Sequence, residues 1–207
     1  MSNLSAYSIA ILLHLAAAVM LVGGSVFALH VRRAILEAPS VGALRAWLGF
    51  ARRSSAANPV AALVLLGTGL YLGSRGWWAY SWFYVALAVW LANAMLAGRV
   101  LKPAGMAMGA AMAGAPDDAP VDGQVDMLRR SPGWRVAGVV MLASDMAMLF
   151  LMVQKPSLVE SLAVVLGAMA IGGGITLLRA RRSSLVPVSG RPQYNAARDD
   201  GHAAAGV

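Results

Sequence analysis

Two ionisable side chains lie inside long apolar segments, where a charged group is rarely placed without a function. His14 follows Tyr7 by about two helical turns, and Asp145 precedes Val153 by a similar distance. Moving such a group into hydrocarbon costs roughly 2.5–3.5 kcal/mol. At 1.5 Å per residue both would lie about 10–12 Å below the same membrane surface. The sequence therefore predicts a polar centre in which a carboxylate could orient an imidazole.

Thr68 is expected at a comparable depth on a neighbouring helix, and Trp90 slightly deeper on another. With His14 and Asp145 they form the predicted cofactor-binding set. We interpret this set as a site that binds a metal or haem, or that relays a proton. The alternative is a polar contact that fixes helix packing without any chemistry. No residue is assigned a catalytic role.

A methionine-rich segment is a second candidate for metal binding. Met106, Met108 and Met112 lie close together in the chain, and three thioethers form the soft ligand set that suits Cu(I). Together with His14 they are the predicted metal ligands. Methionine is also a common filler of apolar, alanine-rich segments, so ordinary packing remains the alternative.

Membrane helices must position these side chains. The chain has 207 residues, of which 59% are hydrophobic, and a mean hydropathy of +0.66. Runs of about 20 apolar residues match the roughly 30 Å thickness of the hydrocarbon. Five such runs occur, at residues 7–30, 58–73, 80–98, 135–153 and 157–178. They predict an all-α membrane protein built as a bundle of about five transmembrane helices.

The net charge of +8 follows the topology of these runs and does not indicate nucleic-acid binding. Only Arg75 and Lys155 lie in the second and fourth connections. The other basic residues that flank the runs are Arg32, Arg33, Arg45, Arg52, Arg53, Arg99, Lys102, Arg129, Arg130, Arg179, Arg181 and Arg182. The positive-inside rule then predicts an N-terminus outside and a C-terminus in the cytoplasm. The expected location is a bacterial inner membrane, with the lipid bilayer as the main partner.

The sequence argues against a cleaved signal peptide and against any chemistry that needs cysteine. The first apolar run lacks a basic leading region and is too long for a signal peptide, so we expect it to stay in the protein. The chain has no cysteine. Disulfides, thiolate metal sites and covalent c-type haem attachment are therefore excluded. Any metal would be held by His, Met, Asp or Glu.

The connections differ in character. In the first of them, Leu44, Trp47, Leu48 and Ala51 recur at helical spacing, which predicts an amphipathic helix at the membrane interface. Residues 103–133 contain no bilayer-length apolar run and are expected to form a partly mobile cytoplasmic loop. The tail, residues 181–207, has little to bury and is expected to be disordered.

Two further patterns concern surfaces. The aromatic residues between Ser74 and Trp82 are typical of an aromatic belt at the outer interface, with a quinone or substrate platform as the alternative. In the fifth run, the small residues Ala163, Gly167 and Gly174 recur with Ile171 at steps of three or four, and Gly172-Gly173-Gly174 gives further small surface. Small residues let helices approach closely in lipid. This predicts a packing face against the bundle or a partner subunit.

Several motifs occur in a recognisable order. His14 is followed by an apolar stretch and a glycine pair; the later motifs are Asn58-Pro59, Thr68-Gly69-Leu70-Tyr71-Leu72, Gly76-Trp77 and Leu151-Met152-Val153-Gln154-Lys155-Pro156. This order resembles predicted bacterial integral membrane proteins that are similar to the copper-resistance protein D domain and, more distantly, to HemJ-type protoporphyrinogen oxidase. The resemblance covers roughly residues 5–156.

The resemblance implies a four-helix core at residues 1–156, to which residues 157–180 add a fifth helix. It also implies copper handling in one branch, and b-type haem with porphyrinogen oxidation in the other. His14 matches the first-helix histidine and is the implied ligand. The third run contains no histidine, where HemJ-type proteins carry histidine and lysine, and Met20 stands where tryptophan is usual. A bis-histidine haem site therefore cannot be built from the transmembrane residues alone.

Three functions follow as hypotheses. The first is a membrane protein that holds haem b or a metal such as copper through His14 near Asp145. The second is a structural accessory subunit that docks onto a larger membrane complex. The third is a permease for copper or another small solute, which would require a homo-oligomer.

Overall fold

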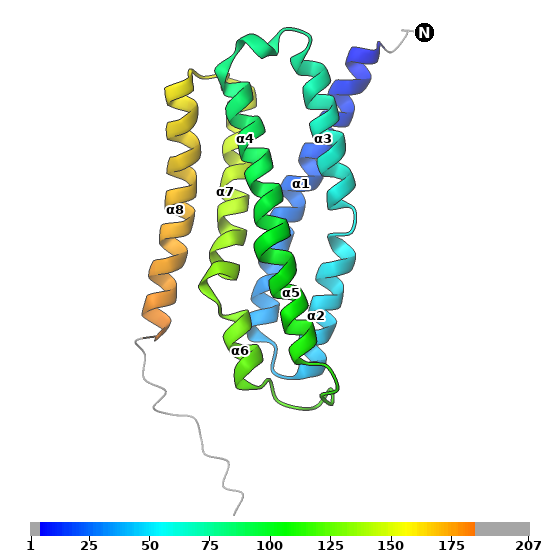
Figure 1. Cartoon of the computed structure of the whole chain (residues 1–207), viewed down its shortest axis with the longest axis vertical. Helices are drawn as coiled ribbons and strands as arrows, with labels where there is room; N and C mark the ends of the chain where they lie inside the picture. Colours follow the sequence, from blue (N-terminus) through cyan, green and yellow to red (C-terminus); the bar gives the residue numbers. More distant parts are fainter. Residues whose placement is uncertain (1–4, 185–207) are drawn as a thin grey trace, which may run out of the picture.

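The computed structural model describes residues 5–184, and the side chains of residues 5–178, as a bundle of long helices (Figure 1). No strand occurs among these residues. Five helical columns are long and apolar enough to cross a membrane, which confirms the predicted fold class. The α-helices are α1 (Ala6–Glu37), α2 (Val41–Ser54), α3 (Asn58–Gly73), α4 (Ser81–Leu96), α5 (Lys102–Ala111), α6 (Gly123–Arg129), α7 (Pro132–Gln154) and α8 (Leu158–Ser184).

Two shorter elements complete the chain. A 3₁₀ turn, η1 (Trp77–Ala79), connects α3 to α4, and a π-helical segment, η2 (Ala97–Leu101), joins α4 to α5 without a break. α8 runs past residue 180, the limit predicted for the fifth helix. The rest of the tail, residues 185–207, lies outside the described residues.

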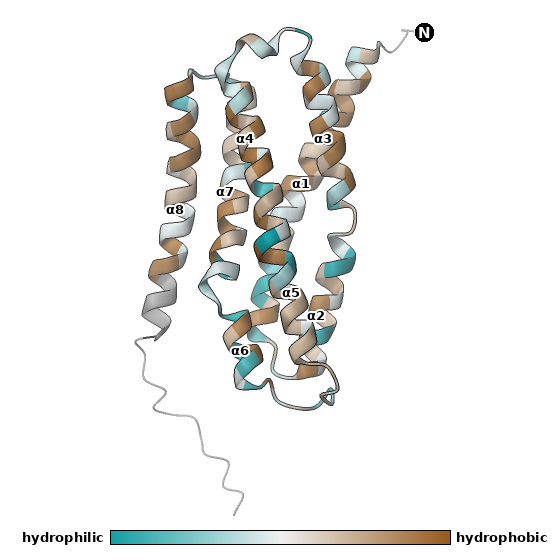
Figure 2. Ribbon diagram, in the orientation of Figure 1, coloured by the Kyte–Doolittle hydropathy of each residue, from teal (hydrophilic) through white to brown (hydrophobic). Residues whose placement is uncertain are grey.

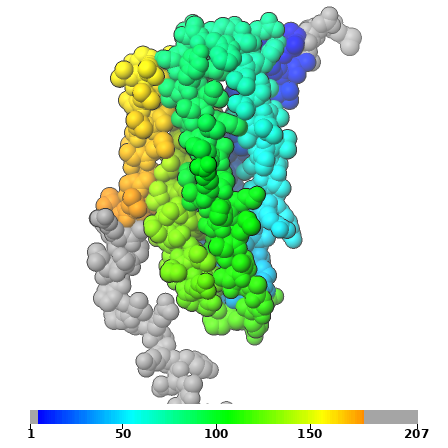
Figure 3. Space-filling model, viewed as in Figure 1, coloured from blue at the N-terminus to red at the C-terminus, as the bar shows by residue number. Residues whose placement is uncertain are grey.

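The columns stand side by side, with α7 at the centre of the packing. α7 contacts α8, α4 and α1, while α1 also packs along α3. The α3–α4 and α7–α8 connections lie at the upper end in Figure 1, and α2, α5 and α6 lie at the lower end. α8 occupies one edge of the molecule (Figure 3). From that edge α8 packs mainly along α7.

Four columns are longer than a bilayer requires. α1, for example, has 32 residues. At 1.5 Å per residue its length is about 48 Å, whereas the hydrocarbon layer is about 30 Å thick. The apolar part of α8 has 21 residues, or about 31 Å, which fits a single crossing. Hydrophilic residues are more frequent toward the lower end (Figure 2). The lower ends of α1, α2, α5 and α6 therefore form an extension beyond the hydrocarbon.

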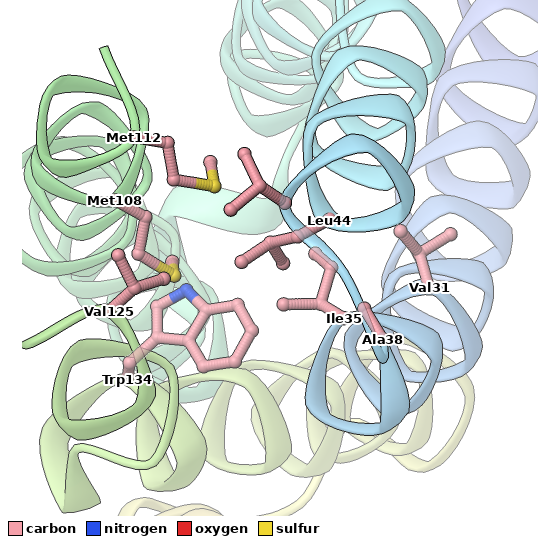
Figure 4. Packing of buried hydrophobic residues seen from close by; sticks show 9 residues of the cluster. Val31, Ile35, Ala38, Leu44, Met108, Met112, Val125 and Trp134 are labelled. Carbon is pink, nitrogen blue, oxygen red and sulfur yellow. The ribbon is translucent and has the colours of Figure 1, made fainter. Parts of the chain in front are cut away.

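This lower extension has an apolar core of its own (Figure 4). Leu44 of α2 is fully buried there against residues from α1, α5, α6 and α7. The other buried members are Val31, Ile35, Ala38, Val41, Met108, Met112, Val125 and Trp134. The predicted amphipathic helix is thus present as α2, but the prediction that it lies along the interface is wrong. α2 stands below α3 along the bundle (Figure 1), because its apolar stripe packs on protein.

The prediction of a partly mobile loop at residues 103–133 is also wrong. α5 and α6 occupy much of this range, and the turns between them are held by α2. The backbone N–H groups of Val41 and Gly42 donate to the carbonyls of Ala119 and Asp117, at 3.0 and 2.9 Å. Arg45 pairs with Asp117 and donates to two further carbonyls of the turn. The turns between α5 and α6 adopt a defined conformation because Arg45 and the backbone N–H groups of Val41 and Gly42 bind their carbonyl oxygens.

Arg129 holds the end of α1 in the same way. Its guanidinium is buried and donates to the carbonyls of Ile35 and Ala38, at 3.1 and 2.9 Å. Asp126, one turn earlier on α6, pairs with it at 2.7 Å. Carbonyls at the end of a helix have no partner within that helix. Arg129 therefore caps α1 as well as contributing to the basic charge of this end.

Of the two alternatives predicted for the small-residue stripe of α8, packing against the bundle is not observed, and contact with a partner subunit stays a prediction. Ser161 and Val165 are buried against the bundle, and a Cβ added at Gly172 would lie 3.2 Å from Val139 of α7. In the predicted stripe, Ile171 is 65% exposed, and a Cβ at Gly167 would meet nothing within 4 Å. The predicted stripe thus faces away from the bundle, because Ser161, Val165 and Gly172 lie on the opposite side of the helix.

We predict that Arg129→Ala lowers the free energy of unfolding by about 2–3 kcal/mol, because two buried carbonyls lose their donor and Asp126 loses one of its two arginine partners. Arg130→Ala is the matched control. It shares Asp126, but its side chain is 56% exposed, so we expect a loss within about 0.5 kcal/mol. Thermal unfolding of the detergent-purified protein measures both. Equal losses for the two variants would contradict the capping role.

Candidate functional site

His14, on α1, is held by one hydroxyl on α3. Its Nδ1 lies 2.9 Å from Oγ1 of Thr68. The Thr68 hydroxyl donates its proton to the carbonyl of Val64, one turn earlier, at 2.6 Å. A hydroxyl has a single proton to donate, so Oγ1 accepts from His14. The hydrogen bonds therefore assign the proton of a neutral imidazole to Nδ1, and Nε2 keeps its lone pair.

The same edge of the imidazole is also shaped by a glycine. A Cβ added at Gly69 would lie 3.2 Å from Cε1 of His14, closer than a side chain there normally comes. The ring is therefore packed against the backbone of α3 at two successive residues, Thr68 and Gly69. No hydrogen bond among the described residues reaches Nε2. The structure thus orients the imidazole and leaves one nitrogen available.

His14 forms part of the wall of a pocket in the upper half of the bundle. The pocket has a volume of about 300 Å³ and lies between α1, α3, η1, α4 and α7. Its wall is almost wholly apolar, and its aromatic residues are Trp77, Trp82, Phe83 and Trp90. Met148 and Met152 of α7 complete it. A concave apolar space with few polar groups is the usual form of a site for a small molecule.

Trp82, a residue of this wall, carries a buried polar atom. Its side chain is only 2% exposed, and its indole N–H is buried without a hydrogen-bond partner among the described residues. Its ring lies 5.7 Å from that of Trp77, centroid to centroid. Buried polar groups in proteins are almost always paired, so this N–H requires an explanation.

Asp145 belongs to a different polar cluster. Its carboxylate accepts from the hydroxyl of Ser25 on α1, at 2.6 Å, and from the amide of Asn93 on α4, at 2.9 Å. The Ser144 hydroxyl lies 2.9 Å from the carbonyl oxygen of the same amide and 2.8 Å from the carbonyl of Met141, one turn earlier, so the two oxygens share its proton. Three helices therefore meet in one network. All of its side-chain oxygens have partners, so the network serves to hold α1, α4 and α7 together.

The predicted pairing of His14 with Asp145 does not form. Ser25, which binds Asp145, follows His14 on α1 by about three helical turns, or roughly 16 Å. The prediction that His14 and Asp145 lie at the same depth is therefore wrong. It assumed that the apolar runs containing them begin and end at the same membrane surface. Of the predicted set, His14 and Trp90 line the pocket and Thr68 orients His14. Asp145 lies in its separate network.

The predicted copper ligands are not gathered into one site. Met108 of α5 and Met112, the residue directly after this helix, are buried in the core of the lower extension (Figure 4). Met106 is 66% exposed, because a residue two positions earlier on a helix points to another side. His14 lies in the upper half, far from all three. Nor does the described part of the chain bring together three or more His, Asp or Glu side chains that could hold a metal.

Ser25, Asn93, Gly69 and Trp82 were not selected from the sequence. Ser25 and Asn93 are polar residues within apolar runs, which is a signal that could have been used. Trp82 was included only in the aromatic belt, where Trp78 and Tyr80 are indeed exposed. The pocket takes Trp77 and Trp82 from that segment. Which aromatic residues turn inward depends on η1, which no sequence pattern indicated.

The upper rim carries two cations. Arg75 lies over the ring of Tyr71 at 5.0 Å, and Nζ of Lys155 lies 5.7 Å from the ring of Trp77. Trp77 is itself part of the pocket wall. A ligand in the pocket would therefore have positive charge near its upper end. No family model, curated protein or solved structure matches this chain.

We predict that the ¹⁵N chemical shifts of histidine-labelled protein show His14 as the Nδ1–H tautomer. Thr68→Val removes the acceptor that holds this proton, so the population should shift toward the Nε2–H form. Thr68→Ser keeps the hydroxyl and is the matched control. His14 is assigned by its loss in His14→Ala. An unchanged tautomer in Thr68→Val would show that Thr68 does not set it.

We predict that Asp145→Ala destabilises the protein by about 1–2 kcal/mol, because Ser25 and Asn93 lose their shared partner. Asp145→Asn should cost less, since an amide both donates and accepts. Met146→Ala, at the adjacent exposed position, controls for truncation on α7. Unfolding of the protein in mixed micelles provides the measurement. If Asp145→Ala lowers the free energy of unfolding no more than Met146→Ala does, the network does not stabilise the protein.

Proposed function

We propose that this multi-pass membrane protein binds one small, lipid-soluble ring compound in the pocket beside His14. The observation that carries the proposal is the orientation of the imidazole. The Thr68 hydroxyl accepts a hydrogen bond from Nδ1–H of His14, a residue of the pocket wall, and no hydrogen bond from the described residues reaches Nε2. An oriented side chain with a free nitrogen, in an apolar space of about 300 Å³, supports a binding role.

The location that we propose is a bacterial inner membrane, with the upper end outside. The basic residues of the lower extension and its flanks support this orientation by the positive-inside rule. The pocket then lies in the outer half of the bilayer. A ligand would enter from the lipid between the helices, since the wall exposes almost no polar surface.

Haem b is the larger ligand that the resemblance to the copper-resistance and HemJ-type proteins suggests, and its macrocycle would need more space than this pocket's volume of about 300 Å³. Two observations favour it. A haem-ligating histidine commonly donates its other ring N–H to an oxygen, as His14 does to Thr68. Arg75 and Lys155 at the rim could pair with propionates. His14 would be the protein's nitrogen ligand, and Met148 or Met152 the only candidates on the opposite wall.

A role as an accessory subunit remains a second proposal, supported by α8. Its stripe of Ala163, Gly167, Ile171 and Gly174 faces away from the bundle. Small residues at such a face suit close contact with another helix, in a second copy of the chain or in a larger complex. Size determination in native nanodiscs distinguishes these arrangements from a monomer.

We predict that the protein in nanodiscs binds 1,4-dimethylnaphthalene saturably above empty nanodiscs, and that Ala86→Phe abolishes this binding. Ala86 is buried and lines the pocket, so a phenyl ring there fills it. Ala92→Phe makes the same change at an exposed position of α4 and should leave binding unchanged. Equilibrium dialysis measures both. Equal partition into loaded and empty nanodiscs would contradict the proposal.

The haem form has its own measurement. After expression with haem precursors, the purified protein should show a Soret band that His14→Ala shifts or removes. Ala86→Phe should lower haem content as well, while Ala92→Phe should not. A colourless wild-type protein that still binds the naphthalene probe would reject haem and keep the small-ligand proposal.

A further inference from the structure

Arg32, near the lower end of α1, is a cation that the protein pairs only in part. Its Nη1 donates to the carbonyl of Trp134 on α7 at 3.4 Å, which is long for a hydrogen bond. It forms no ion pair with any residue that the structure describes, whereas the neighbouring Arg33 pairs with Glu37. A guanidinium has five N–H donors, so most of those on Arg32 lack an acceptor on the protein.

A glycine on α7 fixes where this guanidinium lies. A Cβ added at Gly138 would collide with Nη1 and Cζ of Arg32, so the guanidinium occupies the space of the missing side chain. Trp134 lies one turn earlier on α7, and its ring centroid is 5.4 Å from Cζ of Arg32. Gly138 and Trp134 together form a cradle that holds the guanidinium against α7 without neutralising its charge.

The unpaired nitrogens of Arg32 reach the surface of the protein. Within the described part of the chain, the one side-chain nitrogen or oxygen that is both buried and without a partner belongs to Trp82. Nε and Nη2 of Arg32 have no protein acceptor either, so they are not sealed inside the bundle. A group outside the protein can therefore accept from them.

Gly138 lies on a side of α7 that borders the outside of the bundle. Leu149 and Val153 follow Gly138 along the same side, about three and four turns further on, and both are exposed. α8 covers a different side, where Gly172 packs against Val139. α1 and α8 share no extensive contact. The cradle of Arg32 is therefore at the edge of an open strip of α7 between α1 and α8.

This end of the strip lies at the level of the lipid headgroups. The apolar run of α1 ends at residue 30, and that of α7 begins at residue 135. Arg32 follows the first limit directly, and Arg135 stands at the second. Neither arginine forms an ion pair within the described chain. Basic sites between transmembrane helices at this level bind anionic lipid headgroups, whose phosphate oxygens accept hydrogen bonds.

We propose that Arg32 binds the phosphate of one anionic phospholipid between α1 and α8. Its free N–H groups donate to the phosphate oxygens, because the planar guanidinium matches the geometry of a phosphate. The acyl chains lie along the exposed apolar strip of α7. A zwitterionic lipid brings an ammonium group toward Arg32 and Arg135, so the anionic lipid is preferred. This site is independent of the pocket beside His14, which is in the opposite half of the bundle.

The first experiment compares two lipids with the same acyl chains on the full-length protein in detergent. We expect native mass spectrometry to show one dioleoylphosphatidylglycerol bound about tenfold more tightly than dioleoylphosphatidylcholine, the factor for one charge-assisted hydrogen bond. Inorganic phosphate at equal concentration should not displace the lipid, since it has no acyl chains. Equal affinity for the two lipids would overturn the proposal. Displacement by phosphate would overturn the lipid as the ligand.

Two substitutions locate the site. Arg32→Gln removes the charge, and Gly138→Ala keeps the charge but moves the guanidinium out of its cradle. Each should weaken phosphatidylglycerol binding about tenfold and leave phosphatidylcholine binding within about twofold. A preference for phosphatidylglycerol that survives Arg32→Gln would overturn the proposal, and one that survives Gly138→Ala would overturn the role of the glycine.

Each variant has a matched control. Arg33→Gln removes a neighbouring charge that is exposed and already paired with Glu37. Gly133→Ala adds a methyl group on α7 where a Cβ would meet nothing within 4 Å. Both should bind phosphatidylglycerol within about twofold of the unmodified protein. The comparison of the two lipids on the unmodified protein tests the proposal even if Arg32→Gln or Gly138→Ala fails to fold.

Discussion

Inside a bilayer a polar side chain must find its partner on the protein, because the hydrocarbon offers none. Most of this structure follows from that constraint. His14 is paired with Thr68 on α3, and Ser25 with Asp145 on α7, so α1 is tied at two heights to two different neighbours. Asn93 adds α4 to the lower of these contacts. Helices that are apolar nearly all round thereby acquire defined partners and a defined register.

The two polar clusters differ in what they leave unpaired. Around Asp145 every side-chain oxygen has a partner, and the surrounding helices are packed together. Around His14 one nitrogen is free, and a pocket lies beside it. A closed network stabilises helix packing, whereas an open one supports binding. This difference is why the proposed function centres on His14 and not on the more strongly polar residue Asp145.

The lower extension shows that basic residues at a membrane end have two roles. Arg45 and Arg129 contribute to the positive charge that the topology rule counts, and they also bind backbone carbonyls in the turns and at the end of α1. Apolar residues between them, including Leu44 and Met108, form a core that lipid does not supply (Figure 4). Order outside the hydrocarbon therefore comes from the same combination that orders a water-soluble domain.

The sequence alone determined the five columns, because bilayer-length apolar runs have no other stable form in lipid than helices. Their limits at Asn58 and Gly73 are those of α3, since Pro59 suits the first turn of a helix. His14, Thr68 and Trp90 were recognised from the same reasoning, as polar or aromatic residues at a similar depth. Composition and spacing are local properties, and they suffice for these conclusions.

Only the tertiary structure decided which of these residues meet. Depth along a helix does not specify the side on which a residue points, nor how far a helix extends beyond the membrane, so Asp145 was placed beside His14 when its partner is Ser25. Residues 103–133 contain no apolar run of bilayer length, yet Arg45 of α2 binds a carbonyl of this segment, and Arg129 within it binds the end of α1. Contacts between distant segments depend on the rotation and offset of whole helices, which no local pattern encodes.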